Sequence, residues 1–527
     1  MPRSGMPLRP IPSSLVHVLI MGMSLAGCGP LADPGSAVAP QSSSANRSEG
    51  SGSVDAGDTR LAKAILPWLQ GAPTASAVVP LVDGMDAFAA RTMLIDAAER
   101  TIDAQYYIWQ EDLSGVLLLE ALQRAADRGV RVRLLLDDNR TFGMDRRLAA
   151  LDAHENIEVR LFNPFRFRFW RVFDYLFDFR RINHRMHNKS FTVDNQVTVL
   201  GGRNIGDEYF DAAPEGIMYD LDVLAIGAVV QQVSADFERY WNSRSAYPAH
   251  GLLPEVAPET VAAFRAAGRE RAKQPDAAAY QQALRGRPPM QSVLAERLSW
   301  VATQYLSDDP AKALGDRSAK TLWHDIEPML GRARREMGLI SPYVVPHEDG
   351  AEFLLRAARA GTKVSVLTNS LEATDVAAVH AGYAKWRRRL LEGGVQLFEM
   401  KRDLSRPAYS GAGPLGSSAS TLHAKLFAVD GDRVFIGSFN FDPRSARLNT
   451  ENGLIIESPA LAGRVSEAFI TDIPQRSYKV ELDEQGRLRW IEQRDGQTLV
   501  HREEPGVSAW RALSVKILSH LPIDWLL

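Results

Sequence analysis

The sequence predicts an α/β fold made of two similar halves. Segments with helical periodicity alternate with short runs rich in Val, Leu and Ile, which is the pattern of helices packed on a sheet. Residues 93–139 and 329–371 follow one order: a helical segment, a β-rich run, a second helix that ends at glycine, and an apolar strand. A polar motif then occurs once in each half, in residues 187–204 and 423–440. We therefore expect one α/β unit per motif.

The composition is that of a globular protein. Hydrophobic residues make up 45% and charged residues 24% of the chain, which excludes a wholly disordered protein. The formal net charge is −3, so the chain as a whole has no positive field that would hold a polyanion. A sole cysteine excludes an intramolecular disulfide framework and a Cys-rich zinc or iron–sulfur site.

The chain begins with the features of an export signal. A positively charged start precedes an apolar run over residues 15–25, which is too short to span a bilayer as a helix. The run ends in Leu-Ala-Gly-Cys28, which resembles the lipobox of bacterial lipoproteins. We expect residues 1–28 to be a lipoprotein-type signal peptide, Cys28 to be lipidated, and residues 29–59 to be a flexible polar linker. Such a protein is anchored in the bacterial cell envelope, on the inner or outer membrane, and is exposed to the periplasm.

Both copies of the polar motif fit the pattern His-x-Lys, four residues, Asp, six residues, Gly-small-x-Asn. His and Lys two positions apart point to the same face of a strand, the Asp marks a turn to a hairpin partner, and the glycines let the Asn return close to them. The candidate catalytic residues are His187, Lys189, Asp194, His423, Lys425 and Asp430, and the candidate phosphate-binding residues are Asn204 and Asn440.

Two such copies that face each other place two imidazoles, two ammonium groups and two amides around one pocket. This set of groups suits a phosphodiester, because cations and amides hold the non-bridging oxygens while the imidazoles serve as nucleophile and acid. The histidines outside the motif follow no metal-ligand spacing, and no metal site is expected.

Both motifs resemble the HxK(x)4D signature of the phospholipase D superfamily. Within it the sequence is most similar to the bacterial cardiolipin synthases of the C type, through segments such as QYYIWQED, GGRNIGDEYF, ISPYVVP and NTENGLIIESP. The resemblance implies two phospholipase D-like α/β/α sandwich domains, each with a mixed central sheet and helices on both faces. They would be related by pseudo-twofold symmetry, with the active site at their interface. We place the domains at residues 60–290 and 291–527.

The resemblance also implies a two-step displacement without metal ion or cofactor. One histidine attacks phosphorus and forms a phosphohistidine, while the other protonates the leaving alcohol and then acts as base on the incoming alcohol. Because the superfamily usually carries the nucleophile in the N-terminal motif, we assign His187 as nucleophile and His423 as acid and base. The sequence itself does not order them. The groups that would bind phosphate and stabilise the developing charge are Lys189, Lys425, Asn204 and Asn440.

A histidine nucleophile needs a carboxylate that orients its second ring nitrogen. Asp220 and Glu451 are the candidates, since each opens a similar apolar strand, and Asp222 is an alternative to Asp220. Asp194 and Asp430 belong to the motif, but we expect them to be turn or ion-pair residues.

Residues 165–185 interleave aromatic and arginine side chains directly before the first motif. This mixture suits the headgroup boundary of an anionic bilayer. It could also bind single-stranded nucleic acid, or form a buried aromatic segment with arginines at the surface. We favour a membrane-facing entrance, because Cys28 already places the protein near lipid. The apolar tail at residues 510–527 is either an interfacial amphipathic helix or a docked core helix.

The function expected from the doubled motif, the leader and the resemblance is transfer of a phosphatidyl group from a phospholipid to phosphatidylglycerol, which gives cardiolipin. The alternatives are hydrolysis of phospholipid headgroups by the same residues, or an envelope phosphodiesterase or nuclease, against which the net charge counts. The expected partners are phospholipid substrates (phosphatidylglycerol, with phosphatidylethanolamine as a second candidate) and a membrane surface. No nucleic acid is expected, and the oligomeric state stays open.

Overall fold

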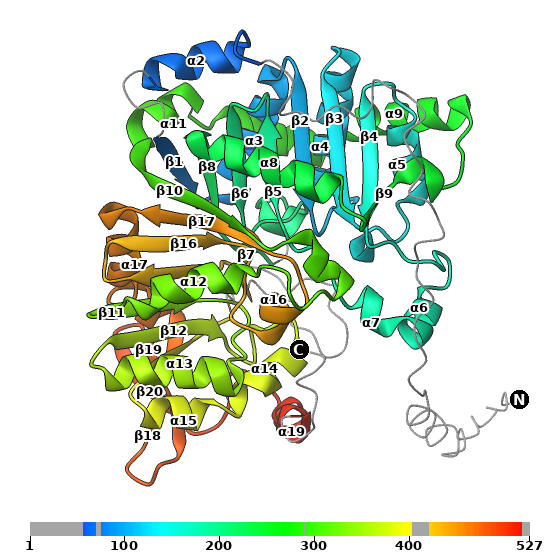
Figure 1. Cartoon of the computed structure of the whole chain (residues 1–527). Coiled ribbons are helices and arrows are strands. Elements are labelled where there is room, and N and C mark those ends of the chain that lie inside the picture. The colour runs from blue at the N-terminus through cyan, green and yellow to red at the C-terminus, as the bar shows by residue number, and fades with distance from the viewer. Residues whose placement is uncertain (1–55, 70–74, 214–215, 289, 403–420, 519–527) are drawn as a thin grey trace, which may run out of the picture. The chain divides into compact units, whose positions relative to one another are not determined.

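Eighteen strands among the described residues pair edge to edge in one mixed sheet that runs through both halves (Figure 1). The computed structural model describes residues 56–69, 75–213, 216–288, 290–402 and 421–518. From the outer edge inwards, the strands of the first half are β9 (Ala246–Pro248), β4 (Ile157–Phe162), β3 (Arg131–Asp137), β2 (Thr101–Tyr106), β5 (Ser190–Val193), β6 (Val197–Gly201), β8 (Asp222–Gly227) and β1 (Ser76–Leu81).

The second half repeats this order from the centre outwards. Its strands are β10 (Ser299–Ser307), β17 (Asn452–Glu457), β16 (Arg433–Gly437), β15 (Leu426–Val429), β11 (Glu336–Ile340), β12 (Lys363–Asn369), β13 (Gln396–Met400), β18 (Ser477–Leu482), β19 (Leu488–Arg494) and β20 (Gln497–His501). In each half, three parallel strands continue into antiparallel ones. The repeat read from the sequence is therefore a repeat of topology, and the expected α/β fold with a mixed sheet is confirmed.

The halves are joined by strand pairing at two places. β1 pairs antiparallel with β10, with Ala77 opposite Trp300. A separate two-stranded sheet pairs β7 (Met218–Tyr219) with β14 (Thr421–Leu422). The domain boundary that we expect at residues 290 and 291 falls at the start of α11, a few residues before the topology repeats at β10.

Helices connect the strands and cover the sheet (Figure 1). In the first half they are α2 (Arg60–Leu69), α3 (Gly84–Ala97), α4 (Leu113–Asp127), α5 (Asp145–Asp152), α6 (Arg171–Phe177), α7 (Phe179–Ile182), α8 (Ala228–Trp241), α9 (Pro258–Arg271) and α10 (Pro275–Arg285). The remainder are α11 (Met290–Arg297), α12 (Leu322–Gly331), α13 (His347–Arg359), α14 (Ala377–Ala384), α15 (Arg387–Glu392), α16 (Pro443–Arg447), α17 (Pro459–Ala468), α18 (Asp472–Arg476) and α19 (Ala509–Leu518).

The two long helices of the sequence repeat both end at a glycine. α4 begins directly after Asp112, which accepts a hydrogen bond from the Gly115 N–H. The chain then reverses at Gly129, whose φ of 94° is a left-handed conformation that favours glycine. Gly361, with φ 91°, does the same after α13. Both glycines are therefore required by the turn that leads into the next parallel strand.

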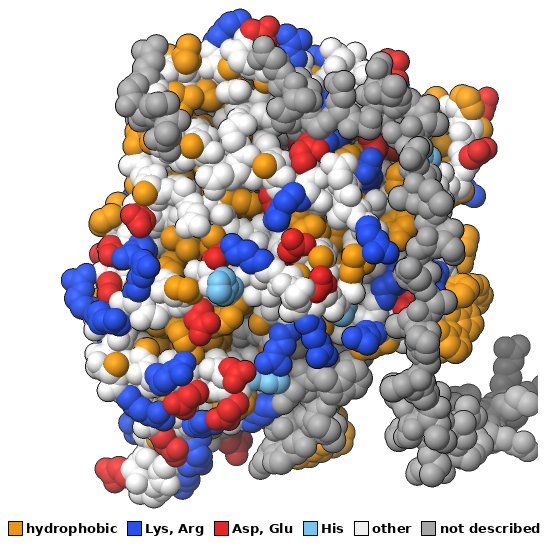
Figure 2. Space-filling model, in the orientation of Figure 1, with side chains coloured by type: hydrophobic (Ala, Val, Ile, Leu, Met, Phe, Trp, Pro, Cys, Tyr) orange, Lys and Arg blue, Asp and Glu red, His pale blue; other side chains and the backbone are white. Residues whose placement is uncertain are grey.

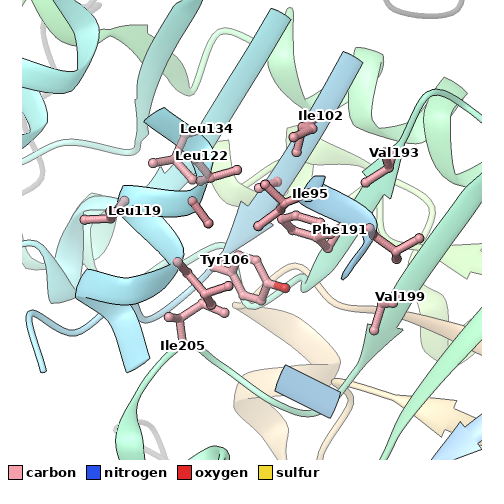
Figure 3. Close-up of a cluster of buried hydrophobic side chains, with 14 of the residues drawn as sticks. Ile95, Ile102, Tyr106, Leu119, Leu122, Leu134, Phe191, Val193, Val199 and Ile205 are labelled. Atoms are coloured by element: carbon pink, nitrogen blue, oxygen red, sulfur yellow. The ribbon is translucent and has the colours of Figure 1, made fainter. Parts of the chain in front are cut away.

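Alternate residues of the strands enter different hydrophobic cores, so both faces of the sheet are covered. In β1, Ala77 and Val79 join a core built from the first half, whereas Val78 joins a core that both halves share. Figure 3 shows the first of these, where side chains of β2, β5 and α4 meet. The shared core brings Val230 of α8 against the side of the sheet that also buries Ile436 of β16. This common core fixes the halves against each other and so positions the site between them.

Several expectations concern the chain ends. The predicted signal peptide, Cys28 and most of the predicted linker lie outside the described residues. Within the described part of the chain, no helix has the length and apolar character that crossing a bilayer requires. Of the apolar tail, α19 is described: Val515 packs against α14, while Trp510, Leu513 and Ile517 are exposed. The described part of the tail is thus a docked helix with an exposed apolar face.

Candidate active site

Each histidine of the motif is held by a carboxylate from the opposite half. His187 Nδ1 lies 2.8 Å from Glu451 Oε2, and His423 Nδ1 lies 2.5 Å from Asp220 Oδ2. All four residues are buried. Because Nδ1 is occupied in both rings, the Nε2 atoms are the ones left for chemistry. Both halves therefore build one site, in which neither histidine has its carboxylate partner on its own half.

Backbone hydrogen bonds also link each histidine to the opposite half. The N–H of His187 donates to the carbonyl of Thr450 at 2.8 Å, and the N–H of His423 donates to the carbonyl of Tyr219 at 2.8 Å. Thr450 and Tyr219 directly precede the two carboxylate residues. One short segment of each half thus fixes both the main chain and the ring of the other half's histidine.

Asp220, and not the alternative Asp222, is the carboxylate that orients His423. Asp222 is the first residue of β8, and its Oδ2 lies 2.8 Å from Nη2 of Arg91 in a fully buried ion pair. The ion pair commits the Asp222 carboxylate to the interior of the first half. Asp220, two residues earlier, is the carboxylate at His423.

The small residue of each motif makes room for, or holds, a carboxylate. A Cβ placed on Gly202 would lie 2.1 Å from Asp220 Oδ1, so only glycine permits this approach. Ser438 occupies the corresponding position in the second copy, and its hydroxyl donates to Glu451 Oε2 at 2.5 Å. The motif's Gly-small pair is therefore required by the histidine-orienting carboxylates.

The two carboxylates have different electrostatic surroundings. Burial raises the pKa of Glu451 above its usual range. At Asp220, burial acts in the same direction, but the charges of Lys425 and His423 outweigh it and lower the pKa overall. An ionised Asp220 stabilises a protonated imidazole at His423, which is the state that an acid and base must reach.

The two lysines are buried against their own histidines. Lys189 Nζ donates to the carbonyl of His187 at 2.6 Å, and Lys425 Nζ lies 3.2 Å from His423 Nε2. Burial lowers the pKa of Lys189 to about 7 and that of Lys425 to about 8. Both ammonium groups are therefore charged only in neutral and acidic solution.

Burial also lowers the pKa of both imidazoles, that of His423 to about 4, and the charges of Lys189 and Lys425 add to this effect. Each lysine acts on the histidine of the other half as well as on its own, so the two motifs share one electrostatic environment. At neutral pH both rings are neutral, which is the state a nucleophile needs. A bound phosphodiester would offset the lysine charges and help His423 to carry the proton for the leaving alcohol.

We expect kcat/KM to fall as the pH rises through about 7 to 8, because Lys189 and Lys425 lose the charges that hold phosphate. A lysine whose pKa is lowered is charged below that pKa and neutral above it. Lys425→Arg keeps its charge in alkaline solution, so the pH profile of this variant should extend to higher pH. An alkaline limb that stays in place in both Lys425→Arg and Lys189→Arg would contradict this assignment.

The two motif aspartates serve the backbone. Asp194 Oδ1 accepts a hydrogen bond from the N–H of Thr101 at 2.8 Å, and Asp430 Oδ1 accepts one from the N–H of Arg335 at 2.7 Å. Each follows a four-residue strand, β5 or β15, and so stands about 16 Å along the chain from the motif lysine. These contacts correct their place among the candidate catalytic residues: they are turn residues that tie the strand end to the neighbouring chain.

The two motif asparagines differ in what their amides contact. Asn204 Oδ1 accepts from the N–H of Ile108 at 3.2 Å, and its Nδ2 donates to the Tyr209 hydroxyl at 3.0 Å. In the described part of the chain, the buried Oδ1 of Asn440 has no hydrogen-bond partner. The free atom of Asn440 is an acceptor, so it gives no support for a contact with an anionic phosphate oxygen, and the amide of Asn204 is already used within the protein.

Two tyrosines outside the motif pack edge-on against the imidazoles. The ring centre of Tyr107 lies 5.0 Å from that of His187, and the ring centre of Tyr209 lies 5.2 Å from that of His423. Tyr209 receives the hydrogen bond of Asn204, so this motif residue acts on His423 through Tyr209. Of these two tyrosines, only Tyr107 has a signal in the sequence, because it is the second of two adjacent tyrosines at the end of a predicted strand.

Among the described residues, one cluster has the composition of a metal site. His380, Glu399 and Glu504 bring their ligand atoms within 4.8 Å of one another. The guanidinium of Arg387 lies among them, with Nε 3.0 Å from Glu399 Oε1 and Nη1 2.5 Å from Glu504 Oε1. Arg387 thus supplies the positive charge that a metal ion would supply, and the cluster ties the segment at Glu504 to α15.

Comparison with known proteins agrees with this geometry. The family described as "Cardiolipin synthase, PLD-like domain" matches residues 92–241 and 326–473. Cardiolipin synthase C of Escherichia coli (strain K12) is 47% identical over 484 residues, which cover 89% of this chain and 100% of that protein. An uncharacterized protein of Helicobacter pylori (strain ATCC 700392 / 26695) is 31% identical over 440 residues, which cover 83% of this chain and 86% of that protein.

The fold also occurs in a solved structure. The phosphatidylserine synthase of Haemophilus influenzae Rd KW20 superimposes with a TM-score of 0.55 at 15% sequence identity, over 88% of this chain and 99% of that chain. At this identity the likeness concerns the fold alone. It extends over both halves of the chain.

Proposed function

The chain belongs to the cardiolipin synthase family of proteins with phospholipase D-like domains, and from this premise we propose that it is a phosphatidyltransferase that makes cardiolipin. The single observation that carries the proposal is the crossed pair of contacts from His187 to Glu451 and from His423 to Asp220. These contacts support a mechanism in which a nucleophile and an acid–base group act in one buried site beside two lysines. Phospholipids are the substrate class, with phosphatidylglycerol as acceptor.

In the first step, His187 Nε2 attacks the phosphorus of the donor lipid. The bond from phosphorus to the headgroup oxygen breaks, and His423, which enters this step as the imidazolium formed when the phosphodiester binds, gives its Nε2 proton to that oxygen. Glu451 accepts the Nδ1–H of His187 and so holds the ring in the tautomer that exposes the Nε2 lone pair. Lys189 and Lys425 stabilise the charge on the equatorial oxygens.

In the second step, a hydroxyl of phosphatidylglycerol takes the place of the headgroup. His423 accepts the hydroxyl proton while the oxygen attacks phosphorus, and the bond from phosphorus to His187 breaks. The products are cardiolipin and the enzyme in its original protonation state. Water in place of the alcohol would give phosphatidic acid by the same steps. How well the site excludes water therefore decides between transfer and hydrolysis.

Product analysis tests this proposal. Purified protein is incubated with labelled phosphatidylglycerol, with and without phosphatidylethanolamine, and the lipids are identified by mass spectrometry. We expect labelled cardiolipin as the main product, and the released headgroup identifies the donor. Phosphatidic acid without cardiolipin would make the protein a phospholipase. Release of nucleotides from DNA or RNA, with no lipid turnover, would make it a nuclease.

The aromatic segment is placed to meet a membrane. Phe169 and Phe177 are 92% and 76% exposed, and Trp170 and Leu176 beside them are also exposed. Arg168 turns inward, where Nη1 lies 2.7 Å from Asp138 Oδ2. Most rings of the segment are therefore exposed, although Phe165 is buried and Arg166 is exposed. Orange side chains gather at the right-hand edge of Figure 2, at the height of α6 in Figure 1. We propose that these side chains enter the bilayer on the periplasmic side of the envelope, and that an acyl chain on Cys28 adds to the attachment.

Replacing Phe167, Phe169 and Trp170 with Ser should weaken binding to anionic vesicles by about tenfold or more, because each exposed ring loses its apolar burial in lipid. Binding is measured by vesicle sedimentation in a Cys28→Ser background, so that no acyl chain contributes. Serine at the exposed residues Leu66 and Trp68 of α2 is the matched control. Equal sedimentation of all three proteins would refute the role of the segment.

A further inference from the structure

One buried hydroxyl outside the repeated motif contacts a carboxylate of the active site. Ser445 belongs to α16, and its Oγ lies 2.7 Å from Glu451 Oε1. Both residues are fully buried. We propose that Ser445 is a positioning residue for His187, which keeps Glu451 ionised and so preserves the imidazole tautomer that attacks phosphorus. This inference rests on the proposed function, in which His187 is the nucleophile.

The contacts of Ser445 fix the direction of its hydrogen bond to Glu451. Its Oγ also accepts a hydrogen bond from the N–H of Asn440 at 3.1 Å. Of these two partners only the carboxylate can accept, so the hydroxyl hydrogen points to Oε1. The other carboxylate oxygen, Oε2, accepts from the Ser438 hydroxyl at 2.5 Å and from His187 Nδ1 at 2.8 Å. Donors therefore reach both oxygens of the carboxylate.

The charge of Glu451 decides which nitrogen of His187 carries the hydrogen. A carboxylate accepts from Nδ1–H and leaves the lone pair on Nε2. A neutral acid would donate its own proton to Nδ1, and the ring hydrogen would then be on Nε2, which could not attack phosphorus. Burial and the charge of Lys189 lower the pKa of His187, so a further proton taken up by the pair rests on the carboxyl group.

Burial favours the neutral form of Glu451, and the serine hydroxyls oppose it. Burial raises the pKa of Glu451, whereas the charge of Lys189 and the hydrogen bonds from Ser438 and Ser445 lower it. The charged and titratable groups around Glu451 are His187, Lys189, Lys312, Lys425, Asp308 and Asp442. Since two of these groups are acids, the hydroxyl of Ser445 is needed in addition to the lysine charges.

A buried ion pair holds Ser445 and Glu451 at this distance. Lys312 Nζ donates to the carbonyl of Ser445 at 2.8 Å and lies 2.9 Å from Asp308 Oδ2. The same oxygen of Asp308 accepts the N–H of Glu451 at 2.8 Å. Lys312 and Asp308 are both buried. One ion pair therefore fixes the backbone of the serine and the backbone of the carboxylate residue.

In the first half, a tyrosine takes the place of this serine. Tyr209 follows Asn204 by five residues, as Ser445 follows Asn440. The Tyr209 hydroxyl accepts from the Asn204 amide at 3.0 Å. Burial acts to raise the pKa of Asp220, but the charges of the lysine and the histidine beside it outweigh burial and keep this carboxylate ionised. We therefore expect Ser445 to act on the histidine of the first motif alone.

The pH profile of headgroup release tests this role, because release is the first step of both transfer and hydrolysis. A carboxyl group that loses a donor has a higher pKa and takes up its proton at higher pH. In Ser445→Ala the acidic limb of kcat should therefore move to higher pH by about one unit, the effect of losing a hydrogen bond to a charged group. On that limb kcat should fall by about tenfold while KM changes by less than about twofold.

Ser445→Thr keeps the hydroxyl and should return the limb to its wild-type position, even if the added methyl group lowers the melting temperature. Ser458→Ala is the matched control, since Ser458 is a buried serine of the same half whose hydroxyl accepts from the N–H of Leu461 at 3.3 Å. It should leave the profile in place. An acidic limb that does not move in Ser445→Ala, or that moves equally in Ser445→Thr, would overturn the inference.

Ring ¹⁵N spectra of His187 give a second readout that needs no substrate. At a pH on the shifted limb, the ring hydrogen should be on Nε2 in Ser445→Ala and on Nδ1 in the wild-type protein and in Ser458→Ala. A hydrogen that stays on Nδ1 in all three proteins would contradict the role of Ser445. If the wild-type protein releases headgroups but forms no cardiolipin, the proposed function fails, whereas the position of the limb still decides the role of Ser445.

Discussion

Replacing His187 or His423 with alanine is expected to lower cardiolipin formation by about a hundred- to ten-thousandfold, and by more at the nucleophile, because each variant lacks one of the two groups that act on the phosphorus. Both losses should be of this size although each variant keeps one complete motif. If each half held its own site, the intact half would leave about half of the activity. The rate is measured by lipid mass spectrometry with phosphatidylglycerol vesicles.

The control for this experiment is a measurement of whether each variant is still folded. Both histidines are buried and each contacts the opposite half, so a variant could lose activity by loosening the halves. Asparagine and glutamine variants, which keep a polar side chain, should have the same melting temperature as the wild-type protein within a few degrees and the same loss of activity. Activity near the wild-type level in either alanine variant would refute the shared mechanism.

Glu451→Gln and Asp220→Asn are each expected to lower kcat by about a hundred- to ten-thousandfold with little change in KM, since an amide does not hold the imidazole in the required tautomer or stabilise its protonated form. The crossing of the contacts gives this prediction a second readout. Glu451→Gln should change the ring ¹⁵N signals of His187, in the opposite half, and leave those of His423 in place. Asp220→Asn should do the reverse.

Glu457→Gln is a matched control for the first variant, because Glu457 ends the same strand, β17, with an exposed side chain. It should leave the rate and both histidine signals unchanged. If Glu451→Gln moved the signals of His423 and not those of His187, the pairing across the halves would be wrong even if activity were lost.

The sequence predicts the repeated α/β topology and the identity of the polar groups because both depend on local pattern. Helical periodicity, glycine stops and the duplicated motif each lie within a few tens of residues. The choice of Asp220 and Glu451 as candidates also follows from a local likeness, two carboxylates that open similar strands. Their partners do not follow from it, because only the packing of the two halves decides that each carboxylate faces the other half's histidine.

Other features depend on contacts that no spacing encodes. Asn204 fits the motif as well as Asn440 does, yet its amide is bonded to Ile108 and Tyr209, a pair of contacts that the spacing of the motif does not predict. The composition of residues 165–185 allowed both a buried and an exposed segment. Side-chain exposure decides this, since most of the rings are exposed while Arg168 binds Asp138 on the inner side.

The most direct test of the account is to count the phosphatidyl groups bound covalently to the enzyme during turnover. The protein is mixed with labelled phosphatidylglycerol, quenched in alkali, digested and analysed by mass spectrometry. One phosphorus atom held between two imidazoles predicts at most one acid-labile adduct per chain, on the peptide that contains His187. Adducts on the peptides of both His187 and His423, approaching two per chain, would mean two independent sites and would contradict the account.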